Sequence, residues 1–473
     1  MSGFDGISST LDAEIQAFRC VEGGVAEPSA VAFGRFLRQL RERRGMSLAK
    51  VCELSRSTAE PFDKGTLSRL ERGQQSPSIF RLGPLSRIYE ISADALLERM
   101  ELDREVDRLG GPDTAGKSYA ELHREGAESV VRANRKWDAY AYFRDALTVA
   151  SPDKRVVEWI NLVTAIRSLG KSALALHELR ELEASGTLDP AQRALVNERL
   201  SACCRSLGEM REAETYADTA IVQAQALGDL RTLAFAYATR GCAAIDQEQW
   251  VIANDYILKG LAAYRDGIEK KSLLRPGPSF EAQGLLMLAE CSLYLRNMPR
   301  TRRLATTAKK MSEEHNLPLG LAYAELILGW LDEASGHVDR ALVRWRQAAT
   351  LAAKIDYPRI AFTAEVEIFR QALEVGDKAR ARASRRRLDR LVPWIPRHIT
   401  AYRRFKHLVD NNAPQTSREL EGEGHEEDPK VSAVGDGGDA ASGGDESEPR
   451  GGRGGRRSRS VRQSDRHQHL PSL

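Results

Sequence analysis

Residues 64–73 read KGTLSRLERG, and the interpretation of the amino-terminal hundred residues depends on this run. Leu67 and Leu70 are three positions apart with cationic side chains around them, as in a short amphipathic helix. Asp63 stands where an amino-terminal cap is needed, and Gly73 favours the left-handed conformation that ends helices. The run therefore predicts a short helix with one apolar face and one basic face.

Four more short helices are expected around this run, within residues 33–99. Gly45 ends the first of them, Ser47 can cap the second, Ser78 or Pro77 opens the fourth, and Ser92 caps the fifth. The apolar positions at helical spacing are Phe33, Phe36, Leu37, Leu40, Val51, Cys52, Leu54, Leu82, Leu85, Ile88, Tyr89, Leu96 and Leu97. Five short helices of this kind predict a compact all-α domain.

The strings LRQLRERRGMSLAKVCEL and KGTLSRLERGQQSPSIFRLGPLSRIYEISADALL resemble the five-helix, lambda-repressor-like helix-turn-helix domain of the XRE/Cro/C1 family. The resemblance implies that the third helix lies in the major groove of double-stranded DNA. Two features depart from the family pattern: the turn before that helix is longer by the residues RSTAEPF, and Leu48 and Lys50 replace residues that are usually polar and acidic or amide. Carried over by position, the implied DNA-binding residues are Lys64, Gly65, Thr66, Ser68, Arg69, Ser47 and Arg72.

The charge of residues 33–99 favours DNA as the partner. This segment has 13 Lys or Arg and 8 Asp or Glu, a net charge of +5, whereas the whole chain has +3. Because Lys and Arg suit the O6 and N7 acceptors of guanine, a half-site that contains G is expected. The alternative is a helix-turn-helix that is retained for protein contacts.

The composition of the whole chain indicates its fold class and its expected location. The chain has 473 residues, 42% of them hydrophobic and few aromatic, and its abundant Ala, Leu, Arg and Glu favour an all-α protein. It has no 18-residue apolar run and no export signal, so we expect a cytoplasmic protein without membrane contact. Its six cysteines form no C-x-x-C pair and are expected as small core residues, with redox sensing by Cys203 and Cys204 as the alternative. We find no catalytic, phosphate-binding or metal-binding motif, and expect neither an enzyme nor a cofactor or metal.

A period of about 40 residues is visible between Tyr119 and Arg390. Small residues at i, i+4 and i+7 recur in seven short helices; the anchors are Ala139, Ala175, Ala213, Ala253, Thr301, Ala341 and Ala381. Another small residue stands twelve positions earlier in several units: Ala127, Ser201, Gly241, Ala289 and Gly329. This pattern resembles the tetratricopeptide repeat family, with seven units, of which the fifth fits poorly because of Pro276, Pro278 and Pro299.

Such an α-solenoid implies a concave surface lined by the first helix of each unit. The inner positions combine charged and aromatic side chains that could hold a peptide or protein partner. The candidates are Arg167, Glu198, Arg205, Gln283, Tyr323 and Trp330. The alternative for any one of them is a solvated polar position.

The expected organisation has five segments. They are a flexible arm (1–29), the helix-turn-helix domain (30–100), a linker (101–117), the repeat domain (118–411) and a disordered tail (412–473) in which an acidic block precedes an Arg/Gly block.

This arrangement resembles bacterial peptide-receptor regulators of the quorum-sensing kind. The resemblance implies a homodimeric transcriptional activator or repressor, whose repeats bind a peptide or protein partner. Two alternatives are an interaction scaffold with secondary DNA contact, and a repressor linked to phage defence or a toxin.

Overall fold

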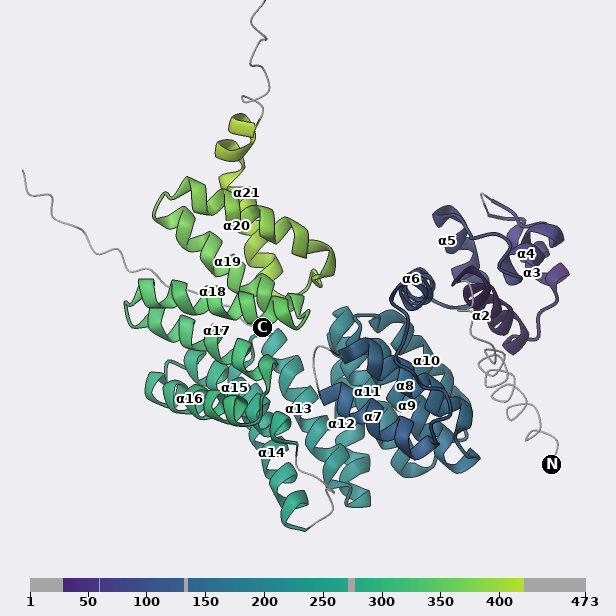
Figure 1. The fold of residues 1–473 in the computed structure, drawn as a ribbon, viewed down its shortest axis with the longest axis horizontal. Helices are drawn as coiled ribbons and strands as arrows, with labels where there is room; N and C mark the ends of the chain where they lie inside the picture. The colour runs from purple at the N-terminus through teal and green to yellow at the C-terminus, as the bar shows by residue number, and fades with distance from the viewer. Residues whose placement is uncertain (1–28, 59, 132–134, 271–276, 421–473) are drawn as a thin grey trace, which may run out of the picture. The chain divides into compact units, whose positions relative to one another are not determined.

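The computed structural model describes residues 29–58, 60–131, 135–270 and 277–420, and every regular element within these ranges is helical (Figure 1). The first five of the described helices match the number and order that the sequence predicts. They are α2 (Ser29–Arg43), α3 (Leu48–Ser55), α4 (Lys64–Glu71), α5 (Ile79–Ile88) and α6 (Ala93–Leu109). The sequence run KGTLSRLE is therefore the third helix of a five-helix domain.

The long turn between α3 and α4 is anchored in the core of this domain. Phe62 is 4% exposed and belongs to the same apolar cluster as Leu37, Leu67 and Tyr89. Its backbone N–H donates to Oγ of the fully buried Ser55 at 2.8 Å. The additional residues of this turn thus leave the start of α4 fixed to the end of α3.

Helix α6 is longer than expected. The sequence predicted a linker over residues 101–117, but α6 continues to Leu109 and packs against α10. Leu102 is fully buried, and Arg99 donates to Asp103 at 2.9 Å, one turn later. The first nine residues of the expected linker are helical because their apolar side has a partner in the repeats.

Seven helical hairpins follow within the described residues, as predicted (Figure 1). They are α7 (Tyr119–Val131) with α8 (Lys136–Val149), α9 (Pro152–Ser168) with α10 (Ser172–Ala184), α11 (Pro190–Leu207) with α12 (Met210–Leu227), α13 (Leu230–Asp246) with α14 (Trp250–Glu269), α15 (Pro278–Tyr294) with α16 (Met298–Glu314), α17 (Pro318–Ala334) with α18 (Val338–Lys354), and α19 (Pro358–Glu374) with α20 (Lys378–Leu391).

Small residues let the two helices of a hairpin approach closely. A Cβ at Gly241 would lie 2.7 Å from Ile257, and one at Gly329 would lie 2.4 Å from Trp345, so both positions require glycine. In the first hairpin the close contact is made by Gly126, which faces Phe143, and not by the exposed Ala127 that the spacing indicated. The seven anchors named from the sequence are all buried.

The fifth hairpin is regular although its prolines suggested a poor fit. Pro278 and Pro299 stand in the first turn of α15 and α16. Backbone N–H groups in the first turn have no partner within the helix, so proline costs little there. Pro276 lies outside the described residues.

The first helices of successive hairpins contact one another from α9 to α19 and form the inner layer of the repeats. After α20 come a short 3₁₀ helix, η2 (Val392–Trp394), and α21 (Thr400–Leu420). The first compact unit ends at Phe405, and the remainder of α21 belongs to a second unit. The expected disordered tail (412–473) begins too early, because α21 continues to Leu420, and the expected arm (1–29) overlaps α2 at Ser29. Residues 1–28 and 421–473 lie outside the described residues. No described helix is long and apolar enough to cross a membrane.

Candidate DNA-binding face and ligand pocket

Helix α4 begins at a capped end. The Asp63 carboxylate accepts hydrogen bonds from the backbone N–H and the hydroxyl of Thr66, at 2.7 and 2.6 Å. These two bonds lower the pKa of Asp63, so the cap stays charged near neutral pH. Thr66 is 7% exposed and is occupied by this cap. The structure therefore gives Thr66 a role in starting the helix.

The other positions on α4 form an open basic face. Lys64, Gly65, Arg69 and Arg72 are exposed, and Ser68 is half-buried. The Arg69 guanidinium donates to the Thr66 hydroxyl at 3.1 Å and so lies toward the start of the helix, beside Gly65. A surface of this kind presents several N–H donors to acceptors in a groove. Ser47, also exposed, caps α3 by accepting from the backbone N–H of Lys50 at 3.2 Å.

Two contacts hold the carboxyl end of α4 against α2. Arg41 forms a two-point ion pair with Glu71, at 2.6 and 2.9 Å, and both side chains are largely buried. This hydrogen bonding to Glu71 raises the pKa of Arg41. At Gly34 an added Cβ would lie 2.4 Å from the carbonyl oxygen of Leu70, so the two helices touch there through their backbones. These contacts fix the direction of the basic face relative to its own domain.

Polar contacts also join α6 to the second hairpin. Glu98 accepts from the backbone N–H of Leu174 at 2.8 Å, in the first turn of α10. Lys171, just before α10, pairs with Glu101, and Arg44 lies 3.4 Å from Glu181. The last helix of the helix-turn-helix domain thus caps a helix of the repeats.

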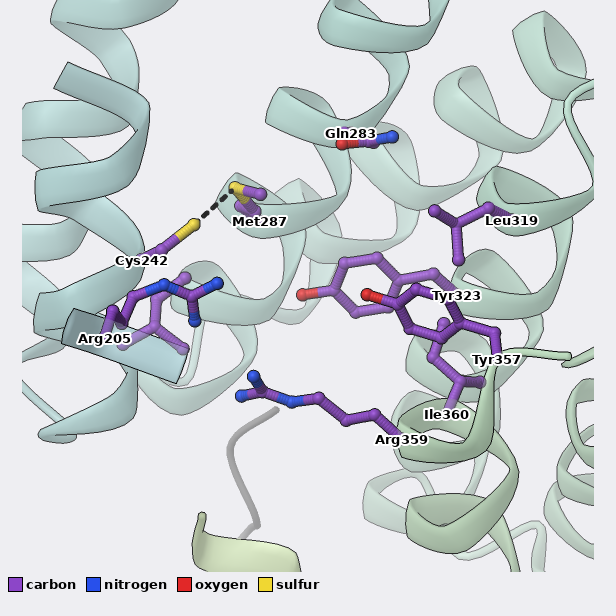
Figure 2. Close-up of a pocket in the computed structure, with 10 residues that line it drawn as sticks. Arg205, Cys242, Gln283, Met287, Leu319, Tyr323, Tyr357, Arg359 and Ile360 are labelled. Atoms are coloured by element: carbon purple, nitrogen blue, oxygen red, sulfur yellow. Dashed lines mark hydrogen bonds between the residues drawn. The ribbon is translucent and has the colours of Figure 1, made fainter. Parts of the chain in front are cut away.

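A pocket of about 100 Å³ opens among the inner helices of the repeats. It is lined by Arg205, Cys242, Ile245, Gln283, Met287, Leu319, Tyr323, Tyr357, Arg359 and Ile360, which we call the inner pocket. Figure 2 shows the guanidinium groups of Arg205 and Arg359 and the hydroxyls of Tyr323 and Tyr357 pointing toward the same space. The arrangement combines cationic donors at one end with apolar walls.

The two arginines of the inner pocket share one carboxylate. Arg205 Nη1 lies 2.7 Å from Oδ2 of Asp246, and Arg359 Nη2 lies 2.6 Å from Oδ1. Burial alone would raise the pKa of Asp246, but Arg359 and Arg205 outweigh it and hold this pKa below its usual value. Asp246 therefore stays ionised at 2% side-chain exposure and ties α19 to α11 and α13.

The inner pocket brings together three of the six ligand-binding candidates, Arg205, Gln283 and Tyr323. The other three lie elsewhere. Trp330 is fully buried in the core of the sixth hairpin, and Glu198 is 2% exposed and bonded to Arg199 and Thr239. Arg167 is half-buried and does not line this pocket. The spacing that identifies inner positions does not distinguish a side chain that reaches the surface from one that packs in the core.

Sequence reasoning missed Tyr357 and Arg359. Both stand at the turn into α19, and the repeat pattern assigns ligand positions to the middle of inner helices. The contact of Arg359 with Asp246 spans 113 residues of sequence, so no local pattern indicates it. The one local feature of the sequence at this place is Pro358 between two polar residues. This pattern is common at helix starts, so it does not identify a ligand site.

Comparison with known proteins supports the amino-terminal assignment directly. Residues 32–100 match the family described as a helix-turn-helix domain. No curated protein matches the chain.

Several solved structures of helical-repeat proteins are remotely similar. PlcR of Bacillus thuringiensis, in complex with the peptide PapR7 and DNA, is 14% identical over 63% of this chain and 99% of its own, with a TM-score of 0.37. A Rap protein complexed with competence and sporulation factor is 13% identical over 82% and 99%, with a TM-score of 0.44. Aspartyl phosphate phosphatase F from Bacillus subtilis is 13% identical over 83% and 96%, with a TM-score of 0.42. Residues 32–100 of this chain match a helix-turn-helix domain, and seven helical hairpins follow within the described residues.

Proposed function

We propose that this protein is a sequence-specific, DNA-binding transcriptional regulator whose repeats sense a peptide or protein partner. The observation that carries the proposal is the exposed basic face of α4, with Lys64, Gly65 and Arg69 open to solvent on a helix fixed from both ends. Side chains on such a helix can reach base edges only if the helix is held in one orientation.

The sensing part of the proposal is supported by the contact between α6 and α10. Because α6 closes the helix-turn-helix domain and Glu98 caps α10, a change in the packing of the repeats reaches the basic face through rigid helices. The inner pocket gives a ligand a place from which to cause such a change.

The regulator is further proposed to act in the cytoplasm as a homodimer on two half-sites, without catalysis of its own. A dimer presents two basic faces, and their separation must match the spacing of the half-sites. A ligand that favours one separation would change the affinity for the operator without touching DNA.

The test is a gel-shift titration of the full chain on DNA fragments selected from the promoter of its own gene. Lys64→Ala and Arg69→Ala should each weaken specific binding about 10- to 100-fold and flatten its salt dependence. Arg382→Ala removes an exposed cationic side chain from α20 and serves as the matched control, with affinity expected to stay near wild type. Unchanged affinity and salt slope in both α4 variants would contradict the proposed function.

A further inference from the structure

The two arginines of the inner pocket keep unused hydrogen-bond donors. A guanidinium has five N–H groups, and the contacts to Asp246 take one nitrogen from each arginine. The Nε–H groups of Arg205 and Arg359 are buried and have no partner among the described residues. A buried N–H without an acceptor costs free energy, so both guanidinium groups keep donors that Asp246 leaves unsatisfied.

The charge at this end of the pocket suits a single negative group. Arg205 and Arg359 contribute +2 and Asp246 contributes −1, so these three directly paired groups together carry +1. Glu290, which is fully buried and does not line the pocket, accepts a hydrogen bond from the hydroxyl of Tyr323. A dianion such as a phosphate monoester would overcompensate the local charge, and a carboxylate would not.

The remaining walls are apolar. Ile245 and Ile360 are buried, and Leu319, Met287 and Cys242 complete the lining around the two tyrosine rings. Because roughly 10–15 Å³ of such space holds one water molecule, about 100 Å³ has room for a group of several heavy atoms. A branched aliphatic side chain of the size of leucine fits both the volume and the lining.

We propose that the inner pocket binds the carboxyl-terminal residue of a peptide, with the terminal carboxylate on Arg205 and Arg359 and an apolar side chain against Ile245, Leu319 and Ile360. In this arrangement Asp246 is an internal competitor, because it holds the same two guanidinium groups when the pocket lacks a ligand. This inference rests on the proposed sensing function and names the ligand group that the repeats recognise.

The competition with Asp246 gives binding a structural consequence. Asp246 closes the seventh hairpin onto the third and fourth, since Arg359 starts α19 and Arg205 is near the end of α11. A ligand carboxylate that displaces Asp246 from these guanidinium groups breaks the ion pairs that hold the seventh hairpin against the third and fourth. Occupancy of a small pocket is thereby linked to the packing between repeats that are distant in sequence.

The experiment measures binding of N-acetyl-L-leucine to the full chain by saturation-transfer NMR at millimolar concentration, with N-acetyl-L-leucinamide as the neutral analogue. The acid should bind and the amide should bind at least about tenfold more weakly, because charge-assisted hydrogen bonds are the stronger kind. Arg359→Gln should weaken binding of the acid by about tenfold or more, and Arg359→Lys by less.

Asp246→Asn distinguishes competition from a purely structural role. Removal of the competing charge should strengthen binding of the acid, by about threefold or more, in protein that is still folded by circular dichroism. Arg344→Gln, which breaks the ion pairs of this α18 residue with the buried Glu325 and Asp332 of α17, is the matched control and should leave binding unchanged.

Equal binding of acid and amide, or weaker binding of the acid to folded Asp246→Asn protein, would overturn the proposed ligand group. Either result would leave the DNA-binding role intact, because that role is tested separately through Lys64 and Arg69. Conversely, loss of the DNA-binding proposal would not affect the measured preference for the acid.

Discussion

The carboxylate of Glu98, on the last helix of the helix-turn-helix domain, accepts a hydrogen bond from the backbone N–H of Leu174 at the start of α10. A helix start carries partial positive charge and unpaired N–H groups, so a carboxylate is favoured there. Burial nevertheless raises the pKa of Glu98 to about 7, from a usual 4.5. The junction between the two domains therefore contains a group that titrates near neutral pH.

The sign of the pH effect follows from this shift. The folded protein holds the Glu98 proton more tightly than the unfolded chain does. Protonation of Glu98 therefore adds to the free energy of unfolding in full below pH 4.5, and this contribution is lost as the pH rises through 7. Glu98→Gln keeps an acceptor for Leu174 and removes the titration. Between pH 5 and pH 8 the melting temperature of the wild type should fall more than that of the variant, by on the order of 2 °C. Parallel pH profiles in differential scanning calorimetry would contradict the assignment.

Gly34→Ala tests the backbone contact between α2 and α4. The new methyl group would lie 2.4 Å from the carbonyl oxygen of Leu70, and backbone atoms cannot move aside as a side chain does. We expect a loss of about 1–3 kcal/mol in the free energy of unfolding and weaker DNA binding, because α4 must shift. Urea denaturation and gel-shift titration measure the two effects. Gly277→Ala, where an added Cβ has no atom within 4 Å, is the control and should cost less than about 1 kcal/mol.

Arg41→Met tests the ion pair at the carboxyl end of α4. It leaves Glu71, with a side chain 6% exposed, without its guanidinium partner. Removal of one partner from a buried pair costs about 3–5 kcal/mol, and the 12% exposure of Arg41 places the expected loss at the lower end of that range. The double variant Arg41→Met/Glu71→Leu should recover part of the loss, because no buried charge is left unpaired. If Arg41→Met alone matches the wild type in urea denaturation, the pair does not stabilise α4.

The reactivity of the adjacent cysteines provides a test of the redox alternative. Cys203 and Cys204 are at most 1% exposed, and burial raises the pKa of Cys203 to about 12 and that of Cys204 well above its usual value. Because the thiolate is the reactive form, iodoacetamide should leave both unmodified in the folded protein at pH 7.5 and modify them after denaturation in guanidinium. Peptide mapping by mass spectrometry distinguishes these states. Rapid modification of either one before denaturation would favour a redox role.

The sequence by itself determined the helices and their order. The informative patterns are the basic run at 64–73, its cap at Asp63 and the period of about 40 residues. All three are short-range, because the geometry of a single helix or hairpin sets them. For the same reason the exposed side chains of α4 were predictable, since a helix with one apolar face must present the opposite one to solvent. Thr66 is the exception, because its hydroxyl bonds to the cap.

Tertiary structure decided the rest. Trp330 and Tyr323 both occupy inner positions of α17, yet Trp330 is fully buried and Tyr323 lines the inner pocket. The pocket itself exists because Arg359 reaches Asp246 across 113 residues of sequence, and α6 extends to Leu109 because α10 covers it. Each of these features depends on how one element packs against another that is distant in the chain, and the free energy of that packing is absent from any local sequence pattern.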